Sequence, residues 1–155
     1  MAGRIEARLK ELGIALPPAA KPIANYVPFT VTGRLVVVSG QLPLKDGAIA
    51  FTGKLGEAVT VEQGQESTRL CFINVLAQLR EAAGGDLDLV KQVLRLGGFI
   101  ASVPGFTQQA AVMNGASDLS VAVFGEAGRH ARTTIGVPVL PADAATEVEA
   151  LVELH

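Results

Sequence analysis

The chain has 155 residues, with 13 lysines and arginines against 15 aspartates and glutamates and a formal net charge of −2. Nucleic-acid binding needs a concentrated basic surface, so the scattered basic residues argue against such a partner. No apolar run approaches the ~20 residues of a membrane span. A single cysteine excludes an intrachain disulfide, and no signal peptide opens the chain. We therefore expect one cytoplasmic domain over residues 1–155.

The composition is unusually apolar for a small domain. Hydrophobic residues make up 49% of the chain and charged residues 18%, against about 25% charged residues in typical globular proteins. Excess apolar surface on a small domain usually lies in a subunit interface. The composition thus predicts a homo-oligomer.

The N-terminal segment is predicted to be a helix followed by an extended connector. Ile5, Leu9 and Leu12 recur at helical spacing, and Gly13 suits the end of a helix. Three prolines then follow by residue 22. Residues 1–23 are therefore expected to precede the core of the domain, residues 24–154.

The core begins with strands. Residues 26–32 and 34–39 are predicted to be two strands that meet at Thr32 and Gly33. Asp46-Gly47 indicates a hairpin that leads to a short strand at 48–51.

Two helices and a long strand follow. Thr60 and Gln63 fit a capping box, which predicts a helix from there to about residue 83. Alternating residues at 91–103 predict a strand, and 107–124 a second helix. This order predicts an α+β two-layer sandwich, with a mixed sheet and two helices on one face. The uncovered face would then be covered by a partner subunit.

The end of the chain is predicted to be a β-hairpin around a turn rich in Pro, Ala and Asp. Period-2 alternation places Ile135, Val137 and Val139 on one face of its first strand, and Val148, Ala150 and Val152 on one face of its second. If these faces pack on the core, the opposite face carries the chemically interesting side chains. These are Arg132, Thr134, Glu147 and Glu149.

Arg132 is the leading candidate site residue. A guanidinium can hold a carboxylate with two hydrogen bonds, but a structural salt bridge to Glu147 or Glu149 is an equal alternative. One of these glutamates could orient a water molecule, although a solvated strand edge would show the same pattern. Thr134 and Glu149 are candidate substrate-binding residues on this face.

Other polar residues are weaker candidates on their own. Asn114 could donate to a ligand or simply belong to a polar helix face, and Tyr26 could offer its hydroxyl to a site or only pack. The chain has two histidines and one cysteine, Cys71, which we expect to be buried. No cluster offers a metal three or four ligands, so we expect no metal.

Four segments, taken in order, resemble a known family. Ala131-Arg132-Thr133, with Ile135, Leu140-Pro141 and Glu147-Val148-Glu149-Ala150, is similar to the C-terminal signature of the Rid family, also called YjgF or endoribonuclease L-PSP. Three further segments fit the family's order: Asn25-Tyr26-Val27, Val38-Ser39-Gly40-Gln41 and Asn114. The resemblance covers about residues 24–154.

Membership would imply a chorismate-mutase-like fold, a homotrimer with ligand clefts between subunits, and cofactor-free hydrolysis of reactive enamines or imines to a keto acid and ammonia. Arg132 would grip the substrate carboxylate, Glu147 would position the attacking water, and Tyr26 and Asn114 would line the cleft. The chain departs from the family at the N-terminal helix, at His130, where proline is common, and at Thr134, where many members have cysteine.

Two other functions stay open from the sequence. A non-enzymatic module could bind small carboxylates through the same arginine. RNA cleavage, the origin of one family name, is disfavoured by the acidic balance and by the absence of a basic patch and of a paired catalytic histidine.

Overall fold

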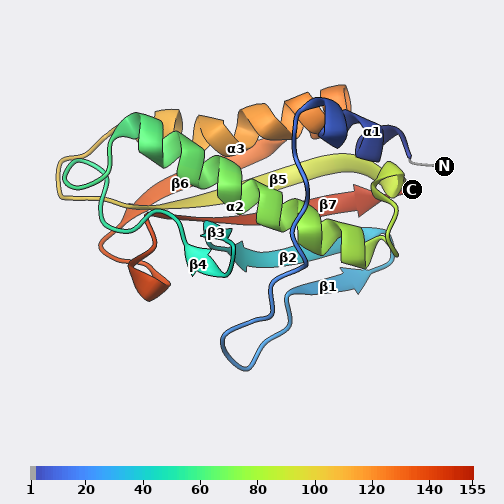
Figure 1. The fold of residues 1–155 in the computed structure, drawn as a ribbon, viewed down its shortest axis with the longest axis horizontal. Coiled ribbons are helices and arrows are strands. Elements are labelled where there is room, and N and C mark those ends of the chain that lie inside the picture. The colour runs from blue at the N-terminus through green and yellow to red at the C-terminus, as the bar shows by residue number, and fades with distance from the viewer. Residues whose placement is uncertain (1–2) are drawn as a thin grey trace.

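The computed structural model describes residues 3–155 and builds them from helices, strands and short 3-10 turns (Figure 1). The helices are α1 (Arg4–Glu11), α2 (Val61–Ala82) and α3 (Gln109–Phe124). The strands are β1 (Phe29–Thr32), β2 (Leu35–Gln41), β3 (Leu44–Lys45), β4 (Ala48–Ile49), β5 (Val90–Ala101), β6 (Ala131–Val137) and β7 (Thr146–Leu154). The 3-10 turns are Leu87–Leu89, Gly125–Gly128 and Pro141–Asp143.

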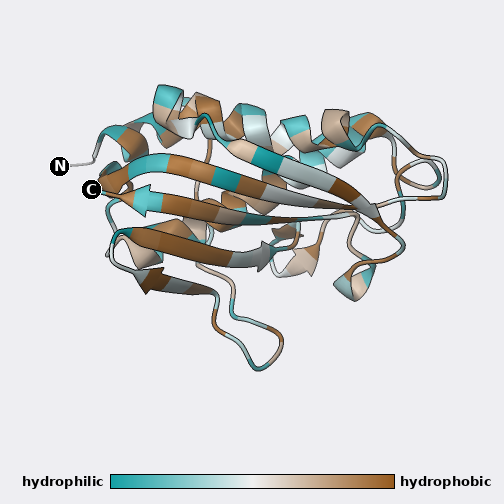
Figure 2. Cartoon of the chain, turned by 180° about the vertical axis from the view of Figure 1, so that it is seen from behind, coloured by the Kyte–Doolittle hydropathy of each residue, from teal (hydrophilic) through white to brown (hydrophobic). Residues whose placement is uncertain are grey.

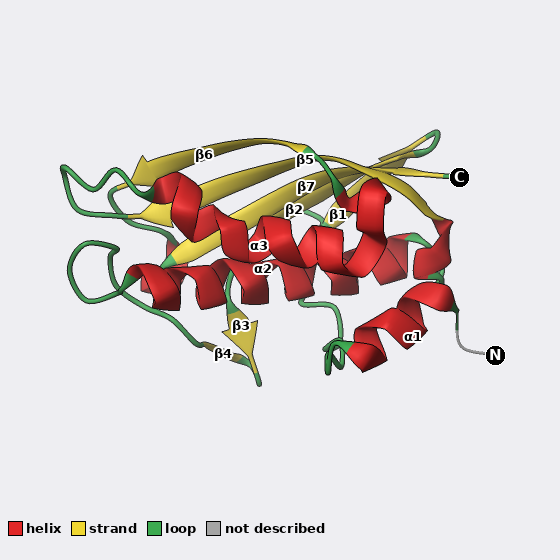
Figure 3. Cartoon of the chain, turned by 90° about the horizontal axis from the view of Figure 1, so that it is seen from above, coloured by secondary structure: helices red, strands yellow, loops and turns green. Residues whose placement is uncertain are grey.

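Five strands form one mixed sheet in the order β1-β2-β7-β5-β6. β5 and β6 are parallel, and the other neighbours are antiparallel. Helices α2 and α3 lie side by side on one face of the sheet, with α1 beside the C-terminal end of α3 (Figure 3). The predicted two-layer α+β sandwich with an N-terminal helix is therefore confirmed. β3 and β4 form a separate hairpin, with positive φ at Asp46 and Gly47 as its turn requires.

The start of α2 confirms the predicted capping box. The Thr60 hydroxyl accepts a hydrogen bond from the backbone N–H of Gln63 at 3.1 Å, and the Gln63 side chain accepts one from the Thr60 N–H at 3.0 Å. Two of the backbone donors at the helix start are thereby satisfied. The helix then lays a fully buried apolar face on the sheet. This face includes Cys71, Phe72, Val75, Leu76 and Leu79.

The two long helices approach closely at Gly115. A Cβ atom at this position would lie 1.9 Å from the backbone oxygen of Gln65 and 2.5 Å from the Thr68 hydroxyl. Thr68 uses that hydroxyl to donate to the carbonyl oxygen of Val112 at 2.8 Å. The absence of a side chain at Gly115 therefore sets how near α3 lies to α2.

Helix α1 is capped by a residue far along the chain. The Asp88 carboxylate accepts hydrogen bonds from the N–H groups of Arg4 and Ile5, each at 2.8 Å. These two bonds lower the pKa of Asp88. Ile5 and Leu9, which recur at helical spacing, are both buried, so the helix is part of the core rather than a free extension.

The predicted C-terminal hairpin is wrong, because β5 lies between β6 and β7. The turn at Pro141–Asp143 carries the chain past β5 to its far side. The aliphatic face of the 131–139 segment is also opposite to the expected one, since Ile135 is 46% exposed and Val139 is 62% exposed. Val148, Ala150 and Val152 are buried as predicted.

The pairing of β5 with both neighbours places the candidate residues on two faces. Leu96 pairs with Arg132 on one side and with Ala150 on the other, and directly paired residues share a face of a sheet. Leu96 and Ala150 are buried beneath the helices, so Arg132 lies on that face. Glu147 and Glu149, displaced from Ala150 by odd numbers of residues, lie on the open face.

The open face of the sheet, which is toward the viewer in Figure 2, carries exposed apolar side chains beside the glutamates of β7. Leu35 and Val37 are 36% and 46% exposed there, and Ile135 continues the surface on β6. Such a surface fits the expectation that a partner subunit covers this face, which stays a prediction. Within residues 3–155 no helix combines the length and the apolar character needed to cross a membrane.

Candidate functional site

Arg132 lies near the start of β6 and reaches under helix α3. Its Nη1 donates to Asn114 Oδ1 at 2.9 Å and to Ser117 Oγ at 3.0 Å, and its Nη2 donates to the carbonyl oxygen of Ala110 at 3.1 Å. All three acceptors come from one helix, so α3 determines the orientation of the guanidinium. The alternative of a salt bridge to Glu147 or Glu149 is excluded, because both lie on the other face of the sheet.

These three bonds leave part of the guanidinium without a partner. Arginine has five N–H donors, and among residues 3–155 no acceptor meets the Nε–H or the second proton of Nη2. Nε and Nη2 are adjacent on the guanidinium and together form a fork that matches the two oxygens of a carboxylate. Arg132 is therefore fixed in place and still able to bind an anion.

Thr134 follows Arg132 on the same face of β6. Its hydroxyl is buried and has no hydrogen-bond partner in the described part of the chain. A buried hydroxyl without a partner is unfavourable. Arg132, Asn114 and Thr134 form what we call the arginine half-site.

A second group of candidate residues gathers at the open face. The Glu147 carboxylate fills the space where a side chain at Gly40 would otherwise be, and Gly40 lines a small pocket together with Tyr26. The Ser39 hydroxyl donates to the carbonyl oxygen of Val27 at 2.7 Å and keeps the Tyr26 segment beside the end of β2. Tyr26 lies in a loop, because β1 begins only at Phe29. We call Tyr26, Gly40 and Glu147 the glutamate half-site.

The environment of Glu147 favours its protonated form. Burial raises the pKa of the half-buried carboxyl, and the negative charge of Glu149 raises it further. A carboxylate with a raised pKa is a better general base than a solvated one. Glu149 itself is occupied elsewhere, because its carboxylate forms an ion pair with Arg95 at 3.8 Å across the strands.

The structure therefore corrects one expectation about the site. Arg132, Thr134, Glu147 and Glu149 do not share a face, and a single chain holds two separate half-sites. Asn114 joins the arginine half-site as a hydrogen-bond acceptor for Arg132. Glu149 pairs with Arg95 and makes no contact with the arginine half-site.

Two residues around Arg132 had not been singled out for a role in the site. Ser117 accepts directly from the guanidinium, and His130 bonds to Ser117. Ser117 is three residues after Asn114, so both face the same side of α3, and this spacing was the available signal. Within residues 3–155, no group of three or more His, Cys, Asp and Glu side chains could hold a metal ion.

Comparisons with known proteins agree with this fold. Residues 6–154 match the model of a family described as YjgF/chorismate mutase-like, putative endoribonuclease. The chain is 52% identical to the protein TCP17 of Trypanosoma cruzi over 154 residues, which cover 99% of this chain and 96% of that one.

Two solved structures are also similar. The protein Atu1372 of unknown function from Agrobacterium tumefaciens is 51% identical, with a TM-score of 0.92 over 97% of this chain and 92% of that chain. A putative endoribonuclease from Shewanella oneidensis is 36% identical, with a TM-score of 0.94 over 98% and 100% of the two chains. The match over nearly the whole chain shows that this protein belongs to the YjgF/chorismate mutase-like family.

Proposed function

We propose that this protein hydrolyses reactive 2-imino or 2-enamino acids to 2-keto acids and ammonia. The observation that carries the proposal is the arginine half-site. Three hydrogen bonds to α3 hold Arg132 in place, while two of its N–H donors have no partner among residues 3–155. Two residues along, the buried hydroxyl of Thr134 also has no partner within these residues. Such a group is suited to a small ligand with one carboxylate and one further polar atom.

The reaction needs little beyond positioning. Arg132 binds the carboxylate and holds the imine carbon in one place. A water molecule attacks that carbon and passes a proton to Glu147, whose raised pKa makes the carboxylate a suitable base. Glu147 returns this proton to the nitrogen, which gives a neutral carbinolamine. Glu147 then takes the hydroxyl proton of the carbinolamine and delivers it to the amino nitrogen as the carbon–nitrogen bond breaks. The products are ammonia and the keto acid, and the protein returns to its starting state.

This chemistry requires two copies of the chain. Arg132 lies on the helix-covered face at the β6 edge, whereas Glu147 lies on the open face. The two groups meet only if the arginine half-site of one subunit adjoins the glutamate half-site of another. An interface between two different surfaces generates a ring when its rotation closes, and the exposed apolar residues of the open face supply surface to be buried. A homotrimer with a cleft at each interface fits these requirements.

A coupled assay tests the activity. An L-amino acid oxidase generates 2-imino acids from leucine, methionine and phenylalanine, and keto acid release is followed with and without this protein. We expect acceleration by the wild type and none by Arg132→Ala. Arg132→Lys is the matched control, because it keeps the charge but loses the planar fork. Full activity in Arg132→Ala would contradict the mechanism.

A mixing experiment tests the location of the site. Arg132→Ala and Glu147→Gln subunits are each expected to be inactive. When they are unfolded together and refolded as mixed oligomers, some interfaces pair an intact Arg132 with an intact Glu147. Activity should then reappear. Failure of mixed oligomers to regain activity would contradict a site shared between subunits.

The same half-site could serve a binding module without catalysis. In that case pyruvate, as the simplest 2-keto acid, would raise the unfolding temperature of the wild type and no substrate of the panel would be turned over. That outcome would replace the proposed hydrolase with a carboxylate-binding protein.

A further inference from the structure

His130 makes two hydrogen bonds that the proposed reaction does not use. Its Nδ1 lies 2.7 Å from the carbonyl oxygen of Gly128, and its Nε2 lies 2.8 Å from Ser117 Oγ. A carbonyl oxygen can only accept, so Nδ1 carries a proton. In the neutral ring Nε2 then carries no proton, and it accepts a hydrogen bond from the Ser117 hydroxyl.

The next bond runs in the same direction. Ser117 Oγ lies 3.0 Å from Nη1 of Arg132, and a guanidinium can only donate. The serine oxygen therefore accepts from Arg132 and has its single proton free for His130. The hydrogen bonds form a chain in which Arg132 donates to Ser117, Ser117 to His130, and His130 to Gly128.

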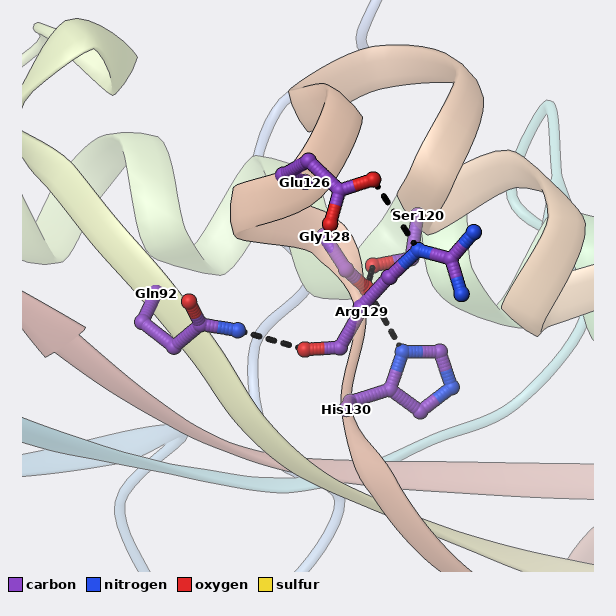
Figure 4. Close-up of polar contacts among 6 residues, drawn as sticks. All are labelled: Gln92, Ser120, Glu126, Gly128, Arg129 and His130. Atoms are coloured by element: carbon purple, nitrogen blue, oxygen red, sulfur yellow. Dashed lines mark hydrogen bonds and ion pairs between the residues drawn. The ribbon is translucent and has the colours of Figure 1, made fainter.

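The end of this chain is anchored from two elements (Figure 4). Ser120 of α3 donates from its hydroxyl to the Gly128 carbonyl oxygen at 2.8 Å, and Gln92 of β5 donates to the carbonyl oxygen of Arg129. Gly128 also lies so close to α3 that a Cβ there would be 2.1 Å from the Ser120 carbonyl oxygen. The Gly128 carbonyl group, which accepts the hydrogen bond from His130, is therefore held in place.

We propose that His130 and Ser117 are positioning residues, which act as a directed hydrogen-bond relay that orients Arg132 for the carboxylate of its ligand. The proposal rests on the proposed function and adds residues to its site. Both protons of Nη1 have an acceptor only while the lone pair of Ser117 Oγ faces the guanidinium. The hydrogen bond from the Ser117 hydroxyl to Nε2 of His130 directs its proton away from Arg132 and so keeps the lone pair in that orientation. Hydrogen bonds linked in this way strengthen one another.

Three variants separate the relay from other effects. Ser117→Ala removes its middle group, and Ser117→Thr is the matched control that keeps the hydroxyl. His130→Asn retains an N–H near the Nδ1 position for Gly128 and removes the acceptor for Ser117. If His130 only stabilised the loop at Gly128, His130→Asn would behave like the wild type. If His130 belongs to the relay, His130→Asn loses the acceptor for Ser117 and with it the relay.

The kinetic readout is the KM for 2-imino acids together with the inhibition constant of pyruvate. Arg132 holds the carboxylate equally in the ground state and the transition state. A weaker hold on the carboxylate therefore raises KM with little change in kcat. We expect Ser117→Ala and His130→Asn each to raise KM about tenfold. Ser117→Thr should keep a KM close to that of the wild type, and the KM of the double variant should be no higher than that of either single variant. Additive effects, or a normal KM in His130→Asn, would overturn the relay.

A spectroscopic readout does not depend on activity. The chain has only two histidines, His130 and His155, so nitrogen-15 NMR of the imidazole rings resolves them directly. We expect the Nδ1–H form of neutral His130 and a shifted Nε2 signal in Ser117→Ala, with His155 unchanged. The Nε2–H form in the wild type would refute the relay. A wild type that neither binds pyruvate nor turns over imines would instead refute the proposed function, and the NMR result would still decide the relay.

Discussion

Replacing Gly115 by alanine should loosen the helix pair and disturb the arginine half-site at once. The new Cβ atom would lie 1.9 Å from the backbone oxygen of Gln65, where ordinary contacts begin at 3.4 Å. The obstacle is backbone, so α3 must move away from α2 by about 1.5 Å unless the helices deform. Overpacking of this kind costs typically 1–3 kcal/mol.

Helix propensity acts in the opposite direction. Alanine is favoured over glycine within a helix by about 1 kcal/mol. A backbone clash as short as this one belongs at the upper end of the overpacking range, so we expect a net loss of about 2 kcal/mol in the free energy of unfolding. Without the clash, Gly115→Ala would be stabilising, and the sign of the change therefore tests the packing directly.

Gly64→Ala is the matched control on the other helix. A Cβ at Gly64 would lie 2.9 Å from the terminal methyl groups of Leu55 and Val112. Both side chains are fully buried and must repack by a few tenths of an ångström, which is still easier than moving the backbone oxygen opposite Gly115. We expect Gly64→Ala to unfold within about 1 kcal/mol of the wild type. Urea unfolding at one fixed protein concentration gives both values.

The same displacement should affect the site. Asn114 and Ser117 flank Gly115 on α3 and accept from Arg132 at 2.9 and 3.0 Å. A shift of about 1.5 Å, the displacement worked from the contact distances, would distort the geometry of both bonds, and any part of it along the donor–acceptor line would lengthen them. Gly115→Ala should therefore also lose affinity for pyruvate, measured by inhibition of imine turnover. A variant as stable as Gly64→Ala and with normal inhibition would refute the inferred closeness of the two helices.

Three further substitutions or treatments have defined outcomes. Thr60→Ala removes half of the capping box and should lower the free energy of unfolding by about 1 kcal/mol, measured in urea; no change would show that the cap is not formed. Because the pKa of Glu147 is raised on folding, the wild type loses stability as the pH rises through the range between its unfolded and folded pKa values. Glu147→Gln should therefore be the more stable protein at neutral pH, with the difference vanishing in acid; urea midpoints across pH check the sign, and a constant difference would contradict it. Burial raises the pKa of the Cys71 thiol to about 12, so a thiol reagent at neutral pH should label the protein only after unfolding, and rapid labelling of the native protein would show that this part of the core opens.

Much of the fold follows from local signals in the sequence. The capping box at Thr60, the Asp46-Gly47 turn and the helical spacing of Ile5 and Leu9 each depend on residues within a few positions of one another. Interactions at such short range are encoded in the order of residues itself. Arg132 was also singled out from the sequence as a candidate site residue, because a guanidinium can hold a carboxylate with two hydrogen bonds.

The pairing of strands had to come from the tertiary structure. Alternation showed which residues of β6 and of β7 share a face, but not that β5 lies between the two strands. Alternation also could not show which face of β6 packs under the helices: Ile135 lies on the open face, whereas Arg132 faces α3. This is why Arg132 and Glu147, expected together, lie on opposite faces.

The partners of Arg132 were likewise decided by packing. Asn114 and Ser117 are 18 and 15 residues away along the chain, and Asp88 reaches the start of α1 across more than 80 residues. Contacts over such separations depend on how the helices settle against the sheet. By itself the sequence determined the helices, the turns and the candidate site residues; the tertiary structure decided which of them meet, because hydrogen-bond partners are selected by distances in space rather than along the chain.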